Sequence, residues 1–246
     1  MKAMIFAAGL GTRLKPITDT LPKALVPVGG RPLIEHVVRK LKASGIEEAV
    51  VNVHHFADKI EEWVARQDIM SIKVSDERNE LLETGGGILH ARQYLDGCGR
   101  FLIHNVDILS DIDLEWFGRS FPEDAMAALL VSERETSRYL LFDPETMRLV
   151  GWTNVKTGEV RSPYADLNPA GCVRMAFSGI HIMSDKVFDV MAEYSDHPRF
   201  PIIDFYLSIC AEHKIYGVPA KELHIIDVGK LDSLQQAESM ARKLGL

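Results

Sequence analysis

A short apolar strand that ends at two closely spaced glycines constrains this chain more than any other feature. Residues 1–11 read MKAMIFAAGLG, so the apolar run stops at Gly9 and Gly11. This pattern predicts a buried strand followed by a loop whose backbone can approach a ligand closely. The same loop carries Arg13 and Lys23, cations suited to neutralising phosphate charge. Residues 7–23, which we call the glycine loop, therefore form a candidate phosphate site, with a solvated basic turn as the alternative.

Two familiar phosphate-binding motifs do not match the glycine loop. The P-loop ends in Gly-Lys-Ser/Thr, which is missing after Gly11, and the dinucleotide-binding motif G-x-G-x-x-G requires glycine at the position of Leu14. Short glycine motifs also occur in ordinary turns, so the glycines alone do not define the class of site.

Helical and strand periodicities alternate after the glycine loop. Apolar residues recur at helical spacing in residues 33–44 and 57–66, and apolar strand segments occupy residues 49–53 and 69–74. Such alternation predicts an α/β fold with a mostly parallel sheet covered on both faces. Ligands of these sheets bind at the carboxyl ends of the strands, so the glycine loop and the residues after Val53 should share one crevice.

Composition narrows the possible partners and the cellular compartment. The chain has 246 residues and a formal net charge of −7 without a clustered basic tract, which argues against a nucleic-acid partner. No run approaches ~18 apolar residues and the N-terminus enters the first strand directly, so we expect a cytoplasmic protein without a membrane partner. The cysteines are widely spaced, which predicts free thiols: Cys98, Cys172 and Cys210.

Four blocks near the N-terminus resemble the first motif of the sugar-1-phosphate nucleotidylyltransferases. They are AAGLGTRLKPIT at 7–18, Pro22-Lys23, Pro27 and GRPLI at 30–34. The resemblance implies a Rossmann-like three-layer sandwich of the GT-A-like nucleotidyltransferase type, formed as one domain by residues 1–246. It also implies catalytic roles for Arg13 and Lys23 on the phosphates. The nucleotide-binding residues that it implies in this loop are Ala8, Gly9, Gly11 and Thr12.

A second glycine-rich block, LETGGGI at residues 82–88, precedes an apolar pattern of helical period. Consecutive glycines predict an open loop before the helix, or alternatively a mobile turn. In the family that the chain resembles, this block forms the loop under the nucleobase, which implies nucleotide contacts from Glu83, Gly85 and Gly86. This version of the block is similar to that of the short bacterial enzymes that make UDP-N-acetylmuramic acid in cell-wall recycling.

Two apolar segments end in an acid, one at Asp107 and the other at Asp227. Carboxylates at strand ends are often only caps or turn formers. If both strands belong to one parallel sheet, however, both acids open onto the crevice of the glycine loop. The resemblance implies that these two aspartates bind Mg²⁺. Val106 stands where most relatives have glycine, whereas the acid after it is retained.

The sugar side carries fewer signals. His54 and His55 lack a third ligand at metal-binding spacing, which favours supporting roles, and Asn52 is a candidate for a polar substrate contact. The resemblance implies sugar contacts from Ser178 and Gly179, for which a glycine bulge in a central strand is the alternative. Residues 132–176 hold an expected hairpin and a Pro/Gly-rich stretch, and we expect them to form a sugar-side or lid subregion.

The resemblance implies an Mg²⁺-dependent enzyme that joins a nucleoside triphosphate and a sugar 1-phosphate into a nucleotide-sugar and releases pyrophosphate. UTP and N-acetylmuramic acid 1-phosphate are the favoured substrates. Glucose, mannose or heptose 1-phosphate with dTTP, GTP or CTP are alternatives within the class. A non-catalytic regulator that binds sugar nucleotides is the alternative outside it, although all four charged site residues are present. The expected assembly is a monomer or a small homo-oligomer.

Overall fold

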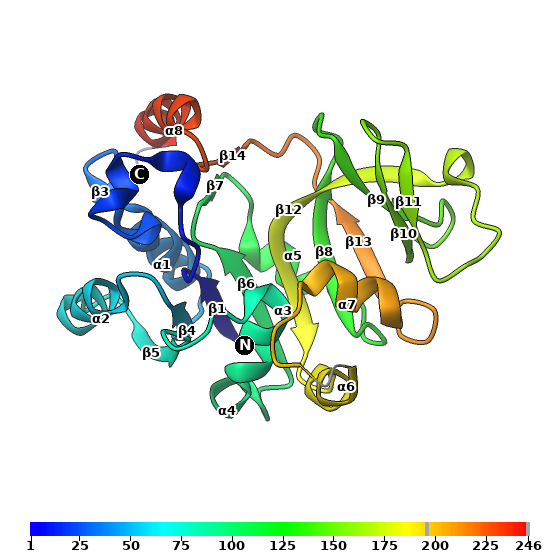
Figure 1. Ribbon diagram of the computed structural model, residues 1–246, viewed down its shortest axis with the longest axis horizontal. Coiled ribbons are helices and arrows are strands. Elements are labelled where there is room, and N and C mark those ends of the chain that lie inside the picture. Colours follow the sequence, from blue (N-terminus) through cyan, green and yellow to red (C-terminus); the bar gives the residue numbers. More distant parts are fainter. Residues whose placement is uncertain (195–196, 245–246) are drawn as a thin grey trace.

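The computed structural model describes residues 1–194 and 197–244, in which a large mixed sheet is covered by helices on both faces (Figure 1). Eight of its ten strands run in the order β11-β10-β9-β12-β6-β1-β4-β5, and the other two, β8 and β13, lie off this path, where β8 pairs with both β12 and β13. Two further ribbons stand apart from this sheet, β2 with β3 and β7 with β14.

The strand bounds are β1 Lys2–Phe6, β2 Pro27–Val28, β3 Arg31–Pro32, β4 Glu48–Val53, β5 Ser71–Asp76, β6 Arg100–Asn105, β7 Ile108–Ser110, β8 Ala127–Ser132, β9 Arg138–Phe142, β10 Leu149–Asn154, β11 Glu159–Arg161, β12 Val173–Ser184, β13 Ile215–Pro219 and β14 Ile225–Asp227. The α-helices are α1 Leu33–Ala43, α2 Ala57–Arg66, α3 Glu83–His90, α4 Arg92–Leu95, α5 Leu114–Arg119, α6 Val187–Tyr194, α7 Ile202–Ile209 and α8 Leu231–Leu244. Short 3-10 turns are η1 Thr12–Leu14, η2 Ile17–Asp19, η3 Lys23–Leu25 and η4 Pro169–Gly171.

Alternation along β1 divides the apolar core between the two faces of the sheet. Ala3 and Ile5 belong to the core under α1, α2, α5 and α8, whereas Met4 belongs to the core under α3, α6 and α7. Successive side chains of a strand point to opposite faces, so a strand with apolar residues at every position must be covered on both sides. The expected α/β three-layer sandwich is confirmed.

The half of the sheet that carries the glycine loop is parallel. β1 pairs in parallel with β4 and with β6, and β4 pairs in parallel with β5. In the register of these pairs, Phe6 stands opposite both Asn52 and Asn105. The carboxyl ends of β1, β4 and β6 therefore form one edge, as the alternation of helices and strands predicts.

The long strand β12 joins this parallel half to an antiparallel half. It pairs antiparallel with β6, β8 and β9, and β10 and β11 extend the sheet on the right of Figure 1. The predicted hairpin is present as β9 and β10. Residues 132–176 thus supply strands to the same sheet, beyond its parallel half.

Candidate active site

A pocket of about 550 Å³ opens at the carboxyl ends of β1, β4 and β6. The glycine loop forms one wall, and the residues just before and at the start of α3 form the opposite wall. The lining residues are Phe6, Ala7, Ala8, Gly9, Leu10, Gly11, Thr12, Arg13, Lys23, Asn52, Leu81, Glu83, Thr84, Asn105, Val106, Asp107 and Gly229. The predicted residues of the glycine loop are all in this set.

The two glycines of the loop serve different purposes. Gly11 adopts a φ of +64°, and a Cβ there would lie 2.9 Å from Cγ2 of Thr18 and 3.2 Å from Cβ of Lys23. The hydroxyl of Thr18 donates to the Gly11 carbonyl at 2.8 Å, which closes the turn. A Cβ on Gly9, by contrast, would meet no atom within 4 Å. Gly11 therefore shapes the loop, and Gly9 leaves open space in the pocket.

Four charged side chains lie close together: Arg13, Lys23 and Asp107 line the pocket, and Asp227 lies beside them outside the lining. The ammonium group of Lys23 pairs with Oδ2 of Asp107, and the Lys23 residue is only 9% exposed. A Cβ on Gly229 would lie 2.7 Å from Oδ1 of Asp227 and 2.9 Å from Nη2 of Arg13, so these two side chains flank the same glycine. The structure thus brings together the two predicted cations and the two predicted acids.

Asp227 is positioned in this cluster by a strand pairing that the sequence did not predict. Its strand β14 is not part of the main sheet and pairs antiparallel with β7, with Asp227 opposite Ile108. The amide of Val228 also donates to the carbonyl of Asp107 at 2.8 Å. The expectation that both acids end strands of one parallel sheet is wrong, although their proximity is correct, because β7 follows directly after Asp107.

The two carboxylates fit a divalent cation. Burial, reinforced by the charge of Asp107, raises the pKa of the Asp227 carboxyl, while Lys23 and Arg13 oppose this shift. Two anionic groups held together in a partly buried site favour a cation between them, and Mg²⁺ commonly takes one or two carboxylates together with phosphate oxygens and water. Within residues 1–194 and 197–244, no group of three or more His, Cys, Asp or Glu side chains forms a complete metal site.

Val106 lines the pocket but is mostly buried. The residue is 4% exposed and belongs to the core under α1, while its amide donates to the carbonyl of Phe6 at 3.1 Å. The branched side chain therefore packs into the protein interior beside the pocket floor.

The glycines of LETGGGI do not form an open loop, which corrects the loop prediction for this block; the nucleotide contacts expected of Gly85 and Gly86 stay predictions. Both lie in α3, are buried and do not line the pocket. Their amides donate to the carbonyl of Phe200 at 2.8 and 3.2 Å, and a Cβ on Gly86 would lie 2.0 Å from the carbonyl oxygen of Pro198. The small residues therefore admit a neighbouring backbone segment, which no local sequence pattern reveals.

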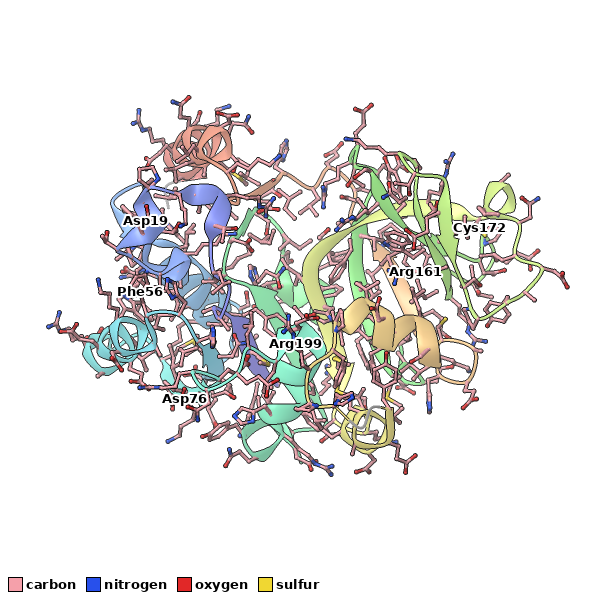
Figure 2. All side chains as sticks on the ribbon, viewed as in Figure 1. Asp19, Phe56, Asp76, Arg161, Cys172 and Arg199 are labelled. Carbon is pink, nitrogen blue, oxygen red and sulfur yellow. The ribbon has the colours of Figure 1, made fainter. Side chains whose placement is uncertain are left out.

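Glu83, at the start of the same helix, does line the pocket. Its φ is +61°, an uncommon conformation for a residue other than glycine. Its Oε1 accepts from Nε and Nη2 of Arg199, both at 2.9 Å, and Figure 2 shows Arg199 beside α3. Arg199 therefore fixes the Glu83 carboxylate at the pocket wall, a pairing across the fold that the sequence analysis missed.

The predicted sugar-side residues lie at a bulge of β12, outside the lining of this pocket. The register of β12 against β8 shifts between Phe177 and His181, and Gly179 has a φ of +74°. A Cβ on Gly179 would lie 2.8 Å from Nδ2 of Asn105, so the glycine admits the Asn105 side chain. The hydroxyl of Ser178 is buried without a hydrogen-bond partner. The bulge alternative is thus observed, and Asn105 is a pocket residue that the sequence analysis missed.

Asn52 lies beneath the glycine loop. It is 2% exposed; its Oδ1 accepts from the amide of Ala7 and its Nδ2 donates to Oε1 of Glu77, both at 2.8 Å. Both ends of its amide are thus bonded within the protein, so Asn52 supports the loop from a position that also lines the pocket. A sugar contact from Asn52 stays a prediction. His54 has a supporting position too, since its Nδ1 lies 2.7 Å from the carbonyl of Glu77. Glu77 itself was missed, although its place directly after β5 marks it as a strand-end acid.

Comparisons with known proteins show the family of this chain. The family model described as "Nucleotidyl transferase" matches residues 2–243. The chain is 36% identical to N-acetylmuramate alpha-1-phosphate uridylyltransferase of Caulobacter vibrioides, over 90% of this chain and 89% of that protein. It is 31% identical to the protein of the same name from Neisseria meningitidis serogroup B, over 98% of both.

Solved structures share the fold at lower identity. HddC from Yersinia pseudotuberculosis complexed with GMP-PN matches with a TM-score of 0.74 at 22% identity, over 97% of this chain and 98% of that one. UDP-glucose pyrophosphorylase from Acinetobacter baumanii matches with a TM-score of 0.78 at 18% identity, over 98% of this chain and 92% of that one.

The fold and the site define a nucleotidyltransferase, and the chain belongs to the nucleotidyl transferase family. Within that family it is an enzyme of the sugar-1-phosphate nucleotidylyltransferases, and the expected similarity to N-acetylmuramate-1-phosphate uridylyltransferases is confirmed. Across the described part of the chain, every helix is too short or too polar to cross a bilayer.

Proposed function

We propose that this chain transfers a uridylyl group from UTP to N-acetylmuramic acid 1-phosphate. In this reaction an oxygen of the sugar phosphate forms a bond to the α-phosphorus, and the bond from that phosphorus to the bridging oxygen of the β-phosphate breaks. UDP-N-acetylmuramic acid and pyrophosphate are the products. The names of the two relatives above 30% identity support this choice of substrates.

The observation that carries the proposal is the convergence of Asp227 with three residues of the pocket lining, Arg13, Lys23 and Asp107. A sugar phosphate is already a nucleophile at neutral pH, so the reaction requires alignment and charge neutralisation instead of a Ser-His or Cys-His pair. In our proposal, Arg13 stabilises the negative charge that grows on the departing pyrophosphate. Lys23 leaves its contact with Asp107 to neutralise the α-phosphate or the incoming sugar phosphate.

Asp107 and Asp227 would hold Mg²⁺ in this proposal. When bound, the ion supplies positive charge to the phosphate oxygens around the reacting phosphorus. The two aspartates would hold the ion beside the glycine loop, whose backbone lines the pocket opposite α3. The Val228 amide, which bonds the Asp107 carbonyl at 2.8 Å, keeps both acids in register.

The sugar side of the proposal rests on β12. Gly179 and the buried hydroxyl of Ser178 lie where β12 passes Asn105, which itself lines the pocket. The Ser178 hydroxyl has no hydrogen-bond partner among the described residues, but it is 1% exposed and outside the pocket lining, so a bond to the sugar requires a shift of β12. We also propose that residues 132–176 are the sugar-side part of one domain spanning the chain.

A grid of substrates tests the function directly. Pyrophosphate release is measured with UTP, dTTP, CTP, GTP and ATP, each paired with the 1-phosphates of N-acetylmuramic acid, glucose, mannose and a heptose. We expect the highest kcat/KM for UTP with N-acetylmuramic acid 1-phosphate. The pyrimidines UTP and dTTP should exceed ATP and GTP by at least about tenfold in kcat/KM, a difference of about 1.4 kcal/mol in transition-state free energy.

Other outcomes of the grid would contradict the proposal in distinct ways. A purine preference would remove the uridylyl assignment, and a preference for glucose or mannose 1-phosphate would remove the sugar. If no pair released pyrophosphate while the protein bound a UDP-sugar, the chain would be a sugar-nucleotide-binding regulator.

A further inference from the structure

One buried carboxylate, that of Glu77, lies beneath the pocket where its two walls meet. Glu77 follows β5, is 2% exposed and does not line the pocket. Burial raises the pKa of this carboxyl, while hydrogen bonds from Asn52 and Leu82 oppose the rise. Burying a carboxylate costs free energy of solvation, so a buried carboxylate that does not line the pocket requires a structural explanation.

One oxygen of Glu77 is connected to the glycine loop by two hydrogen bonds. Oε1 accepts from Nδ2 of Asn52 at 2.8 Å, and Oδ1 of Asn52 accepts from the amide of Ala7 at 2.8 Å. Ala7 is the first residue after β1 and begins the wall that carries Gly9 and Gly11. The position of that wall is thus tied to Glu77 through one side chain.

The other oxygen of Glu77 leads to the opposite wall. Oε2 accepts from the amide of Leu82 at 3.3 Å. Leu82 stands between Leu81 and the start of α3, where Glu83 and Thr84 line the pocket. A single carboxylate therefore anchors both walls, one through each oxygen.

The surroundings of Glu77 leave little freedom for this arrangement. Its amide donates to the Val53 carbonyl at 2.8 Å, and Nδ1 of His54 lies 2.7 Å from its carbonyl oxygen. A Cβ on Gly87 would lie 2.7 Å from Oε1 of Glu77 and 3.2 Å from Nδ2 of Asn52. The third glycine of the LETGGGI block thus makes room for the bond between Glu77 and Asn52.

We infer that Glu77 and Asn52 are positioning residues that fix the width of the nucleotide pocket. Glu77 lies outside the pocket lining, and Asn52 lines the pocket with both ends of its amide already bonded within the protein. Together they hold the start of the glycine loop and the start of α3 at one separation. This inference rests on the proposed function, because it assigns the pocket to the triphosphate. It adds a residue outside the pocket lining on which triphosphate affinity depends.

Exchanging the acid and the amide tests the inference. In Glu77→Gln, the NH₂ group of the new side chain must face either the Nδ2 donor of Asn52 or the amide donor of Leu82, so one hydrogen bond is lost. In Asn52→Asp, two carboxylates face each other. In the double variant Asn52→Asp/Glu77→Gln, Asp at 52 accepts from Ala7 and from the new glutamine, whose oxygen accepts from Leu82. All three bonds are then present again, with the direction of the bond between positions 52 and 77 reversed and the negative charge moved from position 77 to position 52.

The measurements are the Kd of Mg-UTP by titration calorimetry and the KM of each substrate in turnover. If the wild type binds another triphosphate of the grid more tightly, that triphosphate is the probe. Each single variant should raise the Kd and KM of the triphosphate by about tenfold or more, the scale of one unsatisfied buried hydrogen bond. The KM of the sugar phosphate should stay within about twofold. The double variant should return to within about threefold of the wild type.

Glu80→Gln is the matched control, since Glu80 is an exposed acid three positions away and undergoes the same chemical change. It should leave all constants unchanged. The inference is overturned if the double variant binds no better than the worse single one, or if the single variants lower the melting temperature without changing triphosphate affinity. Should Asn52→Asp fail to fold, Glu77→Gln and the double variant still decide between these outcomes. Triphosphate binding without turnover by the wild type would refute the proposed function alone.

Discussion

The substitution Gly86→Ala tests what the glycines of α3 are for. The new Cβ would lie 2.0 Å from the carbonyl oxygen of Pro198. Non-bonded heavy atoms pack at about 3.5 Å, so the helix and the segment of residues 198–200 must separate by roughly 1 Å or more. That movement stretches the bonds from the amides of Gly85 and Gly86 to the carbonyl of Phe200, which measure 2.8 and 3.2 Å.

The magnitude follows from three contributions. Overpacking costs about 1–3 kcal/mol, and weakening two hydrogen bonds adds about 1 kcal/mol. Alanine in place of glycine inside a helix returns about 1 kcal/mol. The net loss in the free energy of unfolding is about 2 kcal/mol, which for a chain of this size lowers the melting temperature by about 4–8 °C.

Differential scanning calorimetry of the wild type and of Gly86→Ala measures this loss. Gly171→Ala is the control, because a Cβ there would meet no atom within 4 Å and its stability should change by less than about 0.5 kcal/mol. If Gly86→Ala melted like the wild type but raised the KM of the triphosphate, the glycine would instead make room for the nucleobase, and the packing argument would be refuted.

Three further predictions concern the charged groups. Arg13→Ala should lower kcat by about 10² to 10³ in steady-state assays while changing KM much less, because the lost interaction is strongest in the transition state. A raised KM with unchanged kcat would show that Arg13 only binds substrate. Asp107→Asn and Asp227→Asn should each raise the Mg²⁺ concentration needed for turnover and lower kcat by at least about 10². The double variant should be little worse than the poorer single variant, because the two residues act as one unit. Wild-type turnover of Asp227→Asn at low magnesium would contradict the two-carboxylate site. Burial lowers the pKa of His104 to about 4 and that of His181 to about 3, so the unfolded chain binds protons below pH 6.5 that the folded chain excludes. The contribution of these histidines to the free energy of unfolding should therefore be intact above pH 6.5 and fall as the pH drops, by about 2 kcal/mol per histidine between pH 7 and pH 5. Urea denaturation at several pH values measures this loss. Midpoints that did not change over this range would refute the lowered pKa values.

The sequence alone determined the elements that depend on local periodicity. The helix predicted for residues 57–66 begins and ends at Ala57 and Arg66 as α2, and the strand before the glycine loop is β1. The parallel edge that holds Arg13, Lys23 and Asp107 also followed from the sequence, because alternating strands and helices leave few ways to arrange a sheet.

Only the tertiary structure decided where distant segments meet. The glycines at 85 and 86 looked like an open loop because nothing near them in the sequence indicates that residues 198–200 pack against them. Asp227 was expected in the main sheet, yet its strand pairs with β7, a partner more than a hundred positions away. Glu77 likewise bonds to Asn52, which lies on another strand, and to Leu82, which lies across a turn. Periodicity records which face of an element is buried, whereas the identity of the packing partner depends on long-range geometry that no local pattern contains.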